Sequence, residues 1–244
     1  MKSWFRNVFP FLFLAAIPSC CPSAPASAAK APEARQRVVL VHGFMETGST
    51  FRMLRQRLEK RGVDVMVAKL KHTDGTGGLE FLATHLKQDI DKQFGPEAPI
   101  SIVAFSMGGL VSREYLQNQG GASRCENLIT VSSPHNGTKA AFCYPSKGVR
   151  QMRPGSEFLR HLRDTQEKLG TMPVVSYRTP MDLVILPPAS SIWDRAENLE
   201  YPVILHPMML TSNTVLNDIE RRLVKEYPEK EKPRLPVTGG RGKL

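Results

Sequence analysis

Two patterns of apolar and polar positions alternate along residues 37–227. Short, almost wholly apolar runs bounded by turn residues indicate strands buried on both faces. Apolar residues spaced three or four apart indicate helices with one buried side, as with Phe51, Leu54 and Leu58 before a stop at Gly62. The predicted strands are "RVVLV", "VDVMVAKL", "PISIVAF", "NLITVSS", "PVVSY" and a short "PVILH". The predicted helices are "STFRMLRQRLEKRG", "LEFLATHLKQDIDKQFG", residues 106–118 and "NTVLNDIERRLVKEY".

Alternating strands and helices with apolar strands predict an α/β fold, in which helices cover both faces of a mostly parallel central sheet. Functional groups in such a sheet collect in the loops beyond the carboxyl ends of the strands. The segment from about residue 133 to 173 leaves room for a small cap at most, so we expect an open or lightly covered pocket.

The first residues have the order of a secretory signal peptide. Lys2 and Arg6 precede an apolar stretch over residues 8–17, and "ASA" at residues 26–28 offers a cleavage site. The alternative is a lipoprotein signal that leaves Cys20 lipidated, although Pro18 is uncommon in that motif. We therefore predict a signal peptide at 1–28, a linker at 29–36, one domain at 37–227 and a disordered basic tail at 228–244. The expected location is extracytoplasmic, either periplasmic or secreted, with a lipid anchor as the variant form.

Two cysteines, Cys125 and Cys143, remain after residue 28. Outside the cytoplasm such a pair favours a disulfide, and two unpaired small hydrophobic residues are the alternative. Their spacing matches no zinc pattern, so we predict no metal site from them.

The net charge of +10 suggests attraction to anionic surfaces such as phospholipid headgroups. A merely solvated basic surface is the alternative. No basic block is interleaved with aromatic residues, so we expect no nucleic-acid partner. We also expect a monomer.

The stretch "SIVAFSMGGL" places Ser106 directly between a predicted strand and a predicted helix. It fits the second half of G-x-S-x-G, the elbow that presents a nucleophilic serine, but Ala104 stands at the first glycine. The sharp turn needs small residues, and Ala104, Gly108 and Gly109 meet that need. An N-cap serine is the alternative, because the isolated pattern is common.

A serine nucleophile requires a base, and in this fold the chain order is serine, acid, histidine. His206 follows "PVIL" and precedes the last helix, where that order places the base. Asp182 follows "PVVSYRTP" and can accept the second imidazole N–H. Asp194 is the alternative acid.

The oxyanion needs two backbone N–H donors. We predict Met107, next to the serine, and Phe44, in the loop after the first strand. In that loop, "HG" at His42 and Gly43 lets the backbone turn, and we interpret His42 as a residue that fixes the loop.

Several collinear blocks resemble bacterial α/β-hydrolases of the lipase and PGAP1-like esterase group. They are "VLVHGF", "IVAFSMGGLVSREYL", "ITVSSPHNGT", "RQMRPGSEFLRHL", "TPMDLVILPPASS" and "LHPMMLT". The resemblance implies the α/β-hydrolase fold and hydrolysis of carboxylic esters without a cofactor. It implies Ser106 as nucleophile, Asp182 as acid, His206 as base, and Phe44 and Met107 as oxyanion donors. His135 in "SSPHNGT" matches a structural turn beside the pocket rather than a second base.

The expected enzyme is a triacylglycerol lipase or carboxylesterase that acts on an ester or lipid substrate through an acyl-enzyme. A phospholipase, a GPI-type deacylase or an acyltransferase with the same triad stays open. A non-catalytic binding module on a hydrolase fold is the interpretation from another class.

Overall fold

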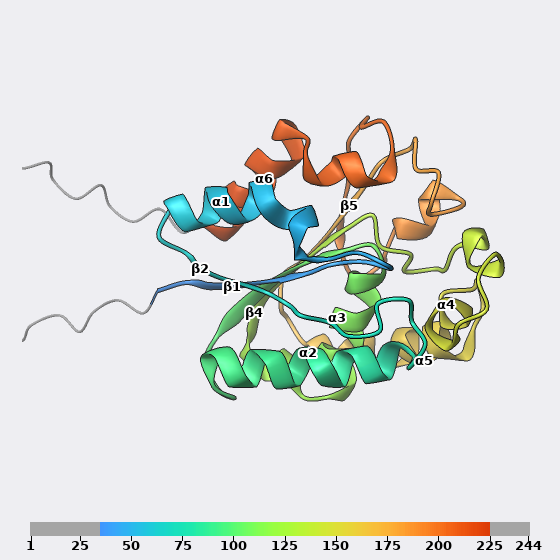
Figure 1. The fold of residues 1–244 in the computed structure, drawn as a ribbon, viewed down its shortest axis with the longest axis horizontal. Coiled ribbons are helices and arrows are strands. Elements are labelled where there is room, and N and C mark those ends of the chain that lie inside the picture. The colour runs from blue at the N-terminus through green and yellow to red at the C-terminus, as the bar shows by residue number, and fades with distance from the viewer. Residues whose placement is uncertain (1–34, 225–244) are drawn as a thin grey trace, which may run out of the picture. The chain divides into compact units, whose positions relative to one another are not determined.

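The computed structural model describes residues 35–224, which form a parallel six-stranded sheet with helices on both faces (Figure 1). The predicted signal peptide, most of the linker and the predicted tail lie outside the described residues. The strand order is β2-β1-β3-β4-β5-β6, and every neighbouring pair is parallel. The strands are β1 (Arg37–Val41), β2 (Asp64–Val67), β3 (Ile100–Phe105), β4 (Cys125–Val131), β5 (Val174–Arg178) and β6 (Glu197–Glu200).

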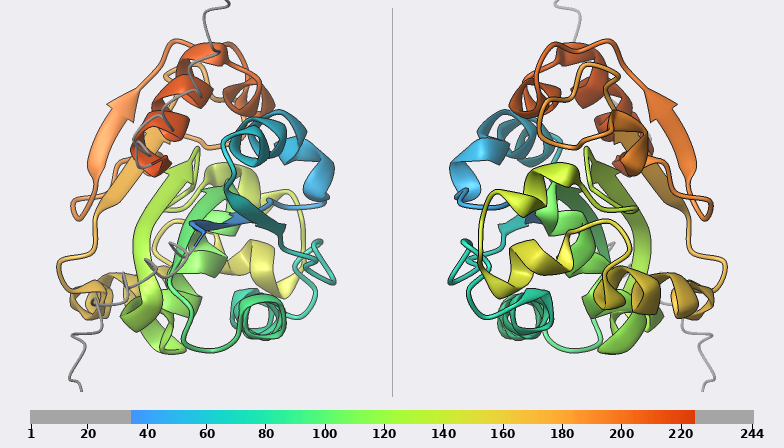
Figure 2. Two further views of the ribbon diagram at one scale, coloured as in Figure 1. Left: turned by 90° about the vertical axis from the view of Figure 1, so that its left-hand side faces the viewer. Right: turned by 90° about the vertical axis from the view of Figure 1, so that its right-hand side faces the viewer.

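Alternate residues of each central strand face opposite layers of the core. In β1, Val39 and Val41 belong to one apolar cluster, and Val38 and Leu40 belong to the other. Helices α2 and α3 cover the first face, and α1 and α6 cover the second (Figure 2). The α-helices are α1 (Arg52–Lys60), α2 (Leu79–Phe94), α3 (Met107–Asn118), α4 (Lys147–Gln151), α5 (Glu157–Asp164) and α6 (Asn213–Leu223). Both layers explain why the central strands are continuously apolar.

Short helices of the 3-10 type complete the described elements. They are η1 (Gly48–Phe51), η2 (Gly121–Arg124), η3 (Lys139–Phe142), η4 (Gln166–Leu169), η5 (Pro188–Ser191) and η6 (His206–Leu210). Within residues 35–224, none of the helices is long and apolar enough to cross a bilayer.

The predicted strand at residues 202–206 is wrong. The sixth strand is the polar segment Glu197–Glu200, which pairs with β5 from Val175↔Glu197 to Arg178↔Glu200. Residues 201–205 form a loop, in which Leu205 has a φ of 69°, and η6 begins at His206. A strand at the edge of a sheet can be polar, because it is not covered on both faces. The segment "PVILH" is a poorer strand, because its proline has no N–H to donate to a neighbouring strand.

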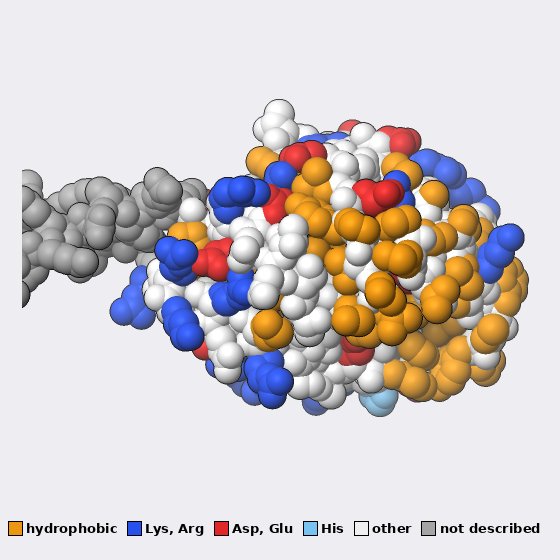
Figure 3. Space-filling view, turned by 90° about the horizontal axis from the view of Figure 1, so that it is seen from above, with side chains coloured by type: hydrophobic (Ala, Val, Ile, Leu, Met, Phe, Trp, Pro, Cys, Tyr) orange, Lys and Arg blue, Asp and Glu red, His pale blue; other side chains and the backbone are white. Residues whose placement is uncertain are grey.

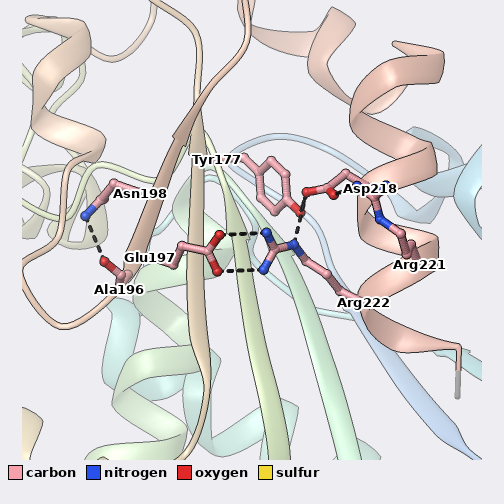
Figure 4. Close-up of polar contacts among 7 residues, drawn as sticks. All are labelled: Tyr177, Ala196, Glu197, Asn198, Asp218, Arg221 and Arg222. Carbon is pink, nitrogen blue, oxygen red and sulfur yellow. Dashed lines mark hydrogen bonds and ion pairs between the residues drawn. The ribbon is translucent and has the colours of Figure 1, made fainter.

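A polar network attaches this edge strand to α6 (Figure 4). Arg222 donates from both terminal nitrogens to the two oxygens of Glu197, each at 2.7 Å. Its Nε donates to Asp218 Oδ2 at 3.0 Å, and the Tyr177 hydroxyl from β5 donates to the same oxygen at 2.6 Å. Charged partners thus hold a strand whose own side chains are mostly exposed.

The predicted disulfide between Cys125 and Cys143 is also wrong, since both thiols are free. Cys125 begins β4, whereas Cys143 follows η3, beyond the carboxyl end of that strand. Seven residues of strand extend about 20 Å, while a disulfide requires Cα atoms within about 7 Å. Burial raises the pKa of the Cys125 thiol to about 12, so it behaves as a small apolar core residue.

Candidate active site

Ser106 lies in the turn that links the buried strand β3 to α3. Its φ is 54° and its ψ is −126°, a backbone conformation that residues other than glycine seldom adopt. The Ser106 N–H donates to the carbonyl of Val131 at 2.9 Å, which fixes the turn against the end of β4. This is the strained strand-to-helix geometry of a nucleophile elbow.

The small residues around Ser106 are required by close backbone contacts. A Cβ on Gly108 would lie 2.4 Å from the carbonyl oxygen of Val41, and one on Gly109 would lie 2.1 Å from Ser133 Oγ. Ala104, where the motif has its first glycine, is in register with Val41 and Thr130 and does not have a positive φ. Packing therefore requires the glycines at positions 108 and 109, whereas position 104, two residues before the serine, accepts a methyl group.

His206 and Asp182 form a buried pair at the same edge of the sheet. Asp182 Oδ2 lies 2.8 Å from His206 Nδ1, and Asp182 Oδ1 accepts the N–H groups of Val184 and Ile185, each at 2.9 Å. Burial raises the pKa of Asp182, but these hydrogen bonds and the imidazole outweigh it and lower the pKa below its usual value. The carboxylate is thus held ionised and fixes the orientation of the ring.

The imidazole of His206 also lies beside the elbow. Its centroid is 4.7 Å from that of Phe105, the residue before Ser106. With Nδ1 held by Asp182, Nε2 is the nitrogen left to act on a neighbouring hydroxyl.

The loop after β1 lies against the serine. A Cβ on Gly43 would lie 3.0 Å from the Cβ of Ser106, so a larger residue here would crowd the serine. Phe44 packs edge-on against Tyr144, with ring centroids 5.2 Å apart. The predicted donors, Phe44 and Met107, thus sit on the two backbone segments that meet at Ser106. His42 is buried with Nδ1 3.4 Å from the Gly43 carbonyl, and burial lowers its pKa, in keeping with a role in fixing the loop.

Glu46 belongs to this site and was missed in the sequence. The N–H of Gly43 donates to its Oε2 at 2.9 Å, which closes the loop on itself. Burial raises the pKa of Glu46, while the Gly43 N–H and the nearby His206 partly offset that rise. The signal available in the sequence was a carboxylate three residues after the glycine, in reach of its N–H.

His135 and Asp194 are not part of this arrangement. His135 Nε2 lies 3.0 Å from Thr130 Oγ1, its Nδ1 lies 3.4 Å from Arg113, and its ring packs against that of Trp193 at an angle of 30°. Asp194 is exposed and lines a cavity of about 80 Å³ with Arg113 and His135, whereas Asp182 is the acid bonded to His206. Among residues 35–224, no cluster of three or more His, Cys, Asp and Glu side chains is arranged to hold a metal ion.

Solved structures of hydrolases share this fold. The lipase BlEst2 of Bacillus licheniformis, in its mature form, matches 79% of this chain and 93% of its own, with a TM-score of 0.67 and 17% identity. Lipase B of Aspergillus fumigatus matches 76% of this chain and 51% of its own, with a TM-score of 0.63 and 17% identity. The phospholipase PlaB of Legionella pneumophila matches 60% of this chain and 40% of its own, with a TM-score of 0.51 and 16% identity. These likenesses confirm the α/β-hydrolase fold.

The sequence itself identifies the family. No curated protein matches the chain. The family model described as palmitoyl protein thioesterase matches residues 37–165, from β1 to the loop after α5, and so includes the loop after β1 and the turn at Ser106. The matched region is more than half of the 244 residues. The chain therefore belongs to the palmitoyl protein thioesterase family and has the α/β-hydrolase fold.

Proposed function

We propose that the chain hydrolyses acyl esters and thioesters with Ser106 as nucleophile, His206 as base and Asp182 as the acid that orients the base. The observation that carries the proposal is the meeting of three segments at one sheet edge. Ser106 stands on a positive-φ elbow, and the His206–Asp182 pair packs on the residue beside it.

The reaction follows from this geometry. Nε2 of His206 takes the proton of Ser106 as the serine oxygen attacks the acyl carbonyl, and Asp182 stabilises the imidazolium. The N–H groups of Phe44 and Met107 hold the oxyanion, and each such donor contributes about 10² to 10³ in rate. His206 returns the proton to the departing alcohol or thiol. Water then attacks the acyl-enzyme by the same steps and releases the acid.

The favoured substrate carries a long acyl chain. The matching family is named for the removal of palmitoyl groups from proteins, and exposed apolar side chains such as Leu183 and Ile204 lie in the same loops as Asp182 and His206. The same mechanism would also cleave a lipid ester, because the serine attacks the acyl carbonyl in the same way whether the leaving group is an alcohol or a thiol. The predicted signal peptide would place this reaction outside the cytoplasm.

The test combines a nucleophile variant with a substrate series. The wild-type chain is assayed on p-nitrophenyl esters and S-acyl thioesters from acetyl to palmitoyl, and kcat/KM is expected to be highest for the long chains. Ser106→Ala should lower kcat by up to about 10⁶, since the residues of a triad act as a unit. A fluorophosphonate probe should label the wild-type chain at Ser106 and leave the variant unlabelled.

The matched control is Ser132→Ala, a serine that also has a positive φ but follows β4. We expect this variant to keep its probe labelling and most of its turnover. The proposal fails if Ser106→Ala retains near wild-type turnover, or if the folded wild-type chain neither reacts with the probe nor cleaves any member of the series.

A further inference from the structure

Exposed apolar side chains from four separate loops gather at the edge of the sheet that carries the candidate site. These loops comprise residues 42–51 after β1, 132–153 after β4, 179–193 after β5 and 201–212 before α6. Of the large hydrophobic side chains exposed among residues 35–224, Phe81 alone lies elsewhere, on α2. The others define the apolar rim: Met45, Phe142, Met181, Leu183, Val184, Ile204, Leu205 and Met208.

Each of the four loops contacts the next, and η1 in the first loop contacts η6 in the fourth, so the rim residues surround one region of the surface. Phe44 in the first loop packs on Tyr144 in the second. Thr138 Oγ1 in the second donates to the carbonyl of Val184 in the third at 2.8 Å. The Asp182–His206 pair joins the third loop to the fourth. Figure 3 shows the result as an area of hydrophobic side chains over one half of the molecule. A contiguous exposed apolar surface of this kind marks a site of protein or membrane contact.

Charge distinguishes the rim from an ordinary surface. Residues 201–212 contain no Lys, Arg, Asp or Glu, and Asp182 is the one charged residue of 179–193, where it is buried against His206. These two loops can therefore be desolvated without burying an unpaired charge, a burial that would cost free energy.

The cations lie to one side of the rim. Residues 127–156 contain Lys139, Lys147, Arg150 and Arg153 and no Asp or Glu. The Arg153 guanidinium lies 4.7 Å above the ring of Phe142, so a rim residue and a cation share one site. Lys and Arg side chains border the hydrophobic area in Figure 3. Apolar side chains flanked by cations suit a surface of anionic headgroups over acyl chains.

We propose that the apolar rim is a docking surface for anionic phospholipid bilayers. Its position around Ser106 rests on the proposed function, since docking there brings the site to acyl groups held in the membrane. A second copy of this chain fits less well. A symmetric dimer through the rim would set the cations of residues 139–153 against each other or against nearly uncharged loops.

Vesicle binding tests the proposal without any hydrolysis. Ser106→Ala full-length protein is sedimented with vesicles of phosphatidylcholine alone and with vesicles that also contain phosphatidylglycerol. The triple change Phe142→Ser, Leu183→Ser and Ile204→Ser removes the most exposed rim residue of three loops. We expect it to weaken binding by at least about tenfold. Phe81→Ser is the matched control and should bind as its parent does. All of these proteins keep the same terminal segments.

The double variant Lys139→Ala with Arg153→Ala tests the contribution of the cations to vesicle binding. This pair should reduce the preference for phosphatidylglycerol, as should high salt, because salt screens headgroup attraction. Equal binding by the parent and the triple variant would overturn the proposal, as would a parent that does not bind vesicles. A dimer that the triple variant converts to a monomer, without vesicle binding, would assign the rim to a second copy instead. Vesicle binding by a wild-type chain that cleaves no soluble substrate would leave the docking surface standing and reject the hydrolase.

Discussion

Asp182, at the carboxyl edge of the sheet, and Asp218, on α6, are both buried, and each accepts hydrogen bonds at both oxygens. Asp218 is held by Tyr177 and by two guanidinium groups, Arg221 and Arg222, which stay charged at every working pH. Asp182 is held by two backbone N–H groups and by the imidazole of His206, a group that is charged only when it is protonated. The first environment anchors an element, whereas the second can accommodate a proton that arrives and leaves.

Of changes to the two aspartates, removing the charge of Asp182 should have the larger effect, and that effect should be on activity rather than on stability. Asp182→Asn is expected to lower kcat by about 10⁴, because the ring of His206 loses the acceptor that fixes its tautomer. The measurement is turnover of a soluble ester, together with urea unfolding to confirm the fold. The proposed difference between the two aspartates would be wrong if Asp218→Asn, the matched change, lowered kcat as strongly.

The matched change at Asp218 should act on stability. Burial raises the pKa of Asp218, but hydrogen bonds from Tyr177, Arg221 and Arg222 outweigh it and bring the pKa to about 2. Asp218→Asn should reduce the free energy of unfolding by about 2 kcal/mol at neutral pH and leave kcat nearly unchanged.

The pH dependence of this effect has a fixed sign. A lowered pKa gives stability that is complete above the usual value of 3.8 and is lost as the pH falls toward 2. The unfolding free energies of wild type and Asp218→Asn, measured by urea titration, should therefore converge across that window. A gap that stayed constant down to pH 2 would show that the carboxylate charge contributes nothing.

A smaller effect is expected at Glu46, inside the candidate active site. Glu46→Gln keeps an acceptor for the Gly43 N–H but removes a negative charge near His206. The imidazolium loses that stabilisation, so the acid limb of the pH profile of kcat/KM should move to lower pH, with kcat at its plateau changed by no more than a few-fold. Glu46→Ala, which also loses the acceptor, should instead lower the plateau. Identical profiles for wild type and Glu46→Gln would exclude an electrostatic role.

The smallest effect is expected at the exposed end of the Asp218 network. Glu197 is bonded by Arg222 at 2.7 Å, but its side chain is 53% exposed. Glu197→Gln should lower the free energy of unfolding by less than about 1 kcal/mol, since solvent screens such a pair. Thermal unfolding of this variant beside Asp218→Asn gives the check. A loss as large as that of Asp218→Asn would mean that the edge strand depends on this ion pair alone.

The sequence by itself determined most of the sheet and indicated the chain positions of the candidate site. Strands such as β1 and β3 are buried on both faces, so their apolar runs needed no knowledge of their neighbours. Ser106, between an apolar run and small residues, was readable for the same local reason. Asp182 and His206 followed from chain order, and the structure places them as a bonded pair beside the elbow.

Other features were decided only by the tertiary structure, because they depend on which segments of the chain meet. The edge strand is Glu197–Glu200 because β5 and Arg222 hold it, although its residues are polar and "PVILH" has the more strand-like composition. Cys125 and Cys143 are close in sequence but are separated by a whole strand. Glu46 and the apolar rim emerge when four loops converge at one sheet edge. The pattern of apolar residues along a segment shows which of its faces is buried. Which distant segments pair is fixed by packing and hydrogen bonds, and these cannot be predicted from the periodicity of one segment.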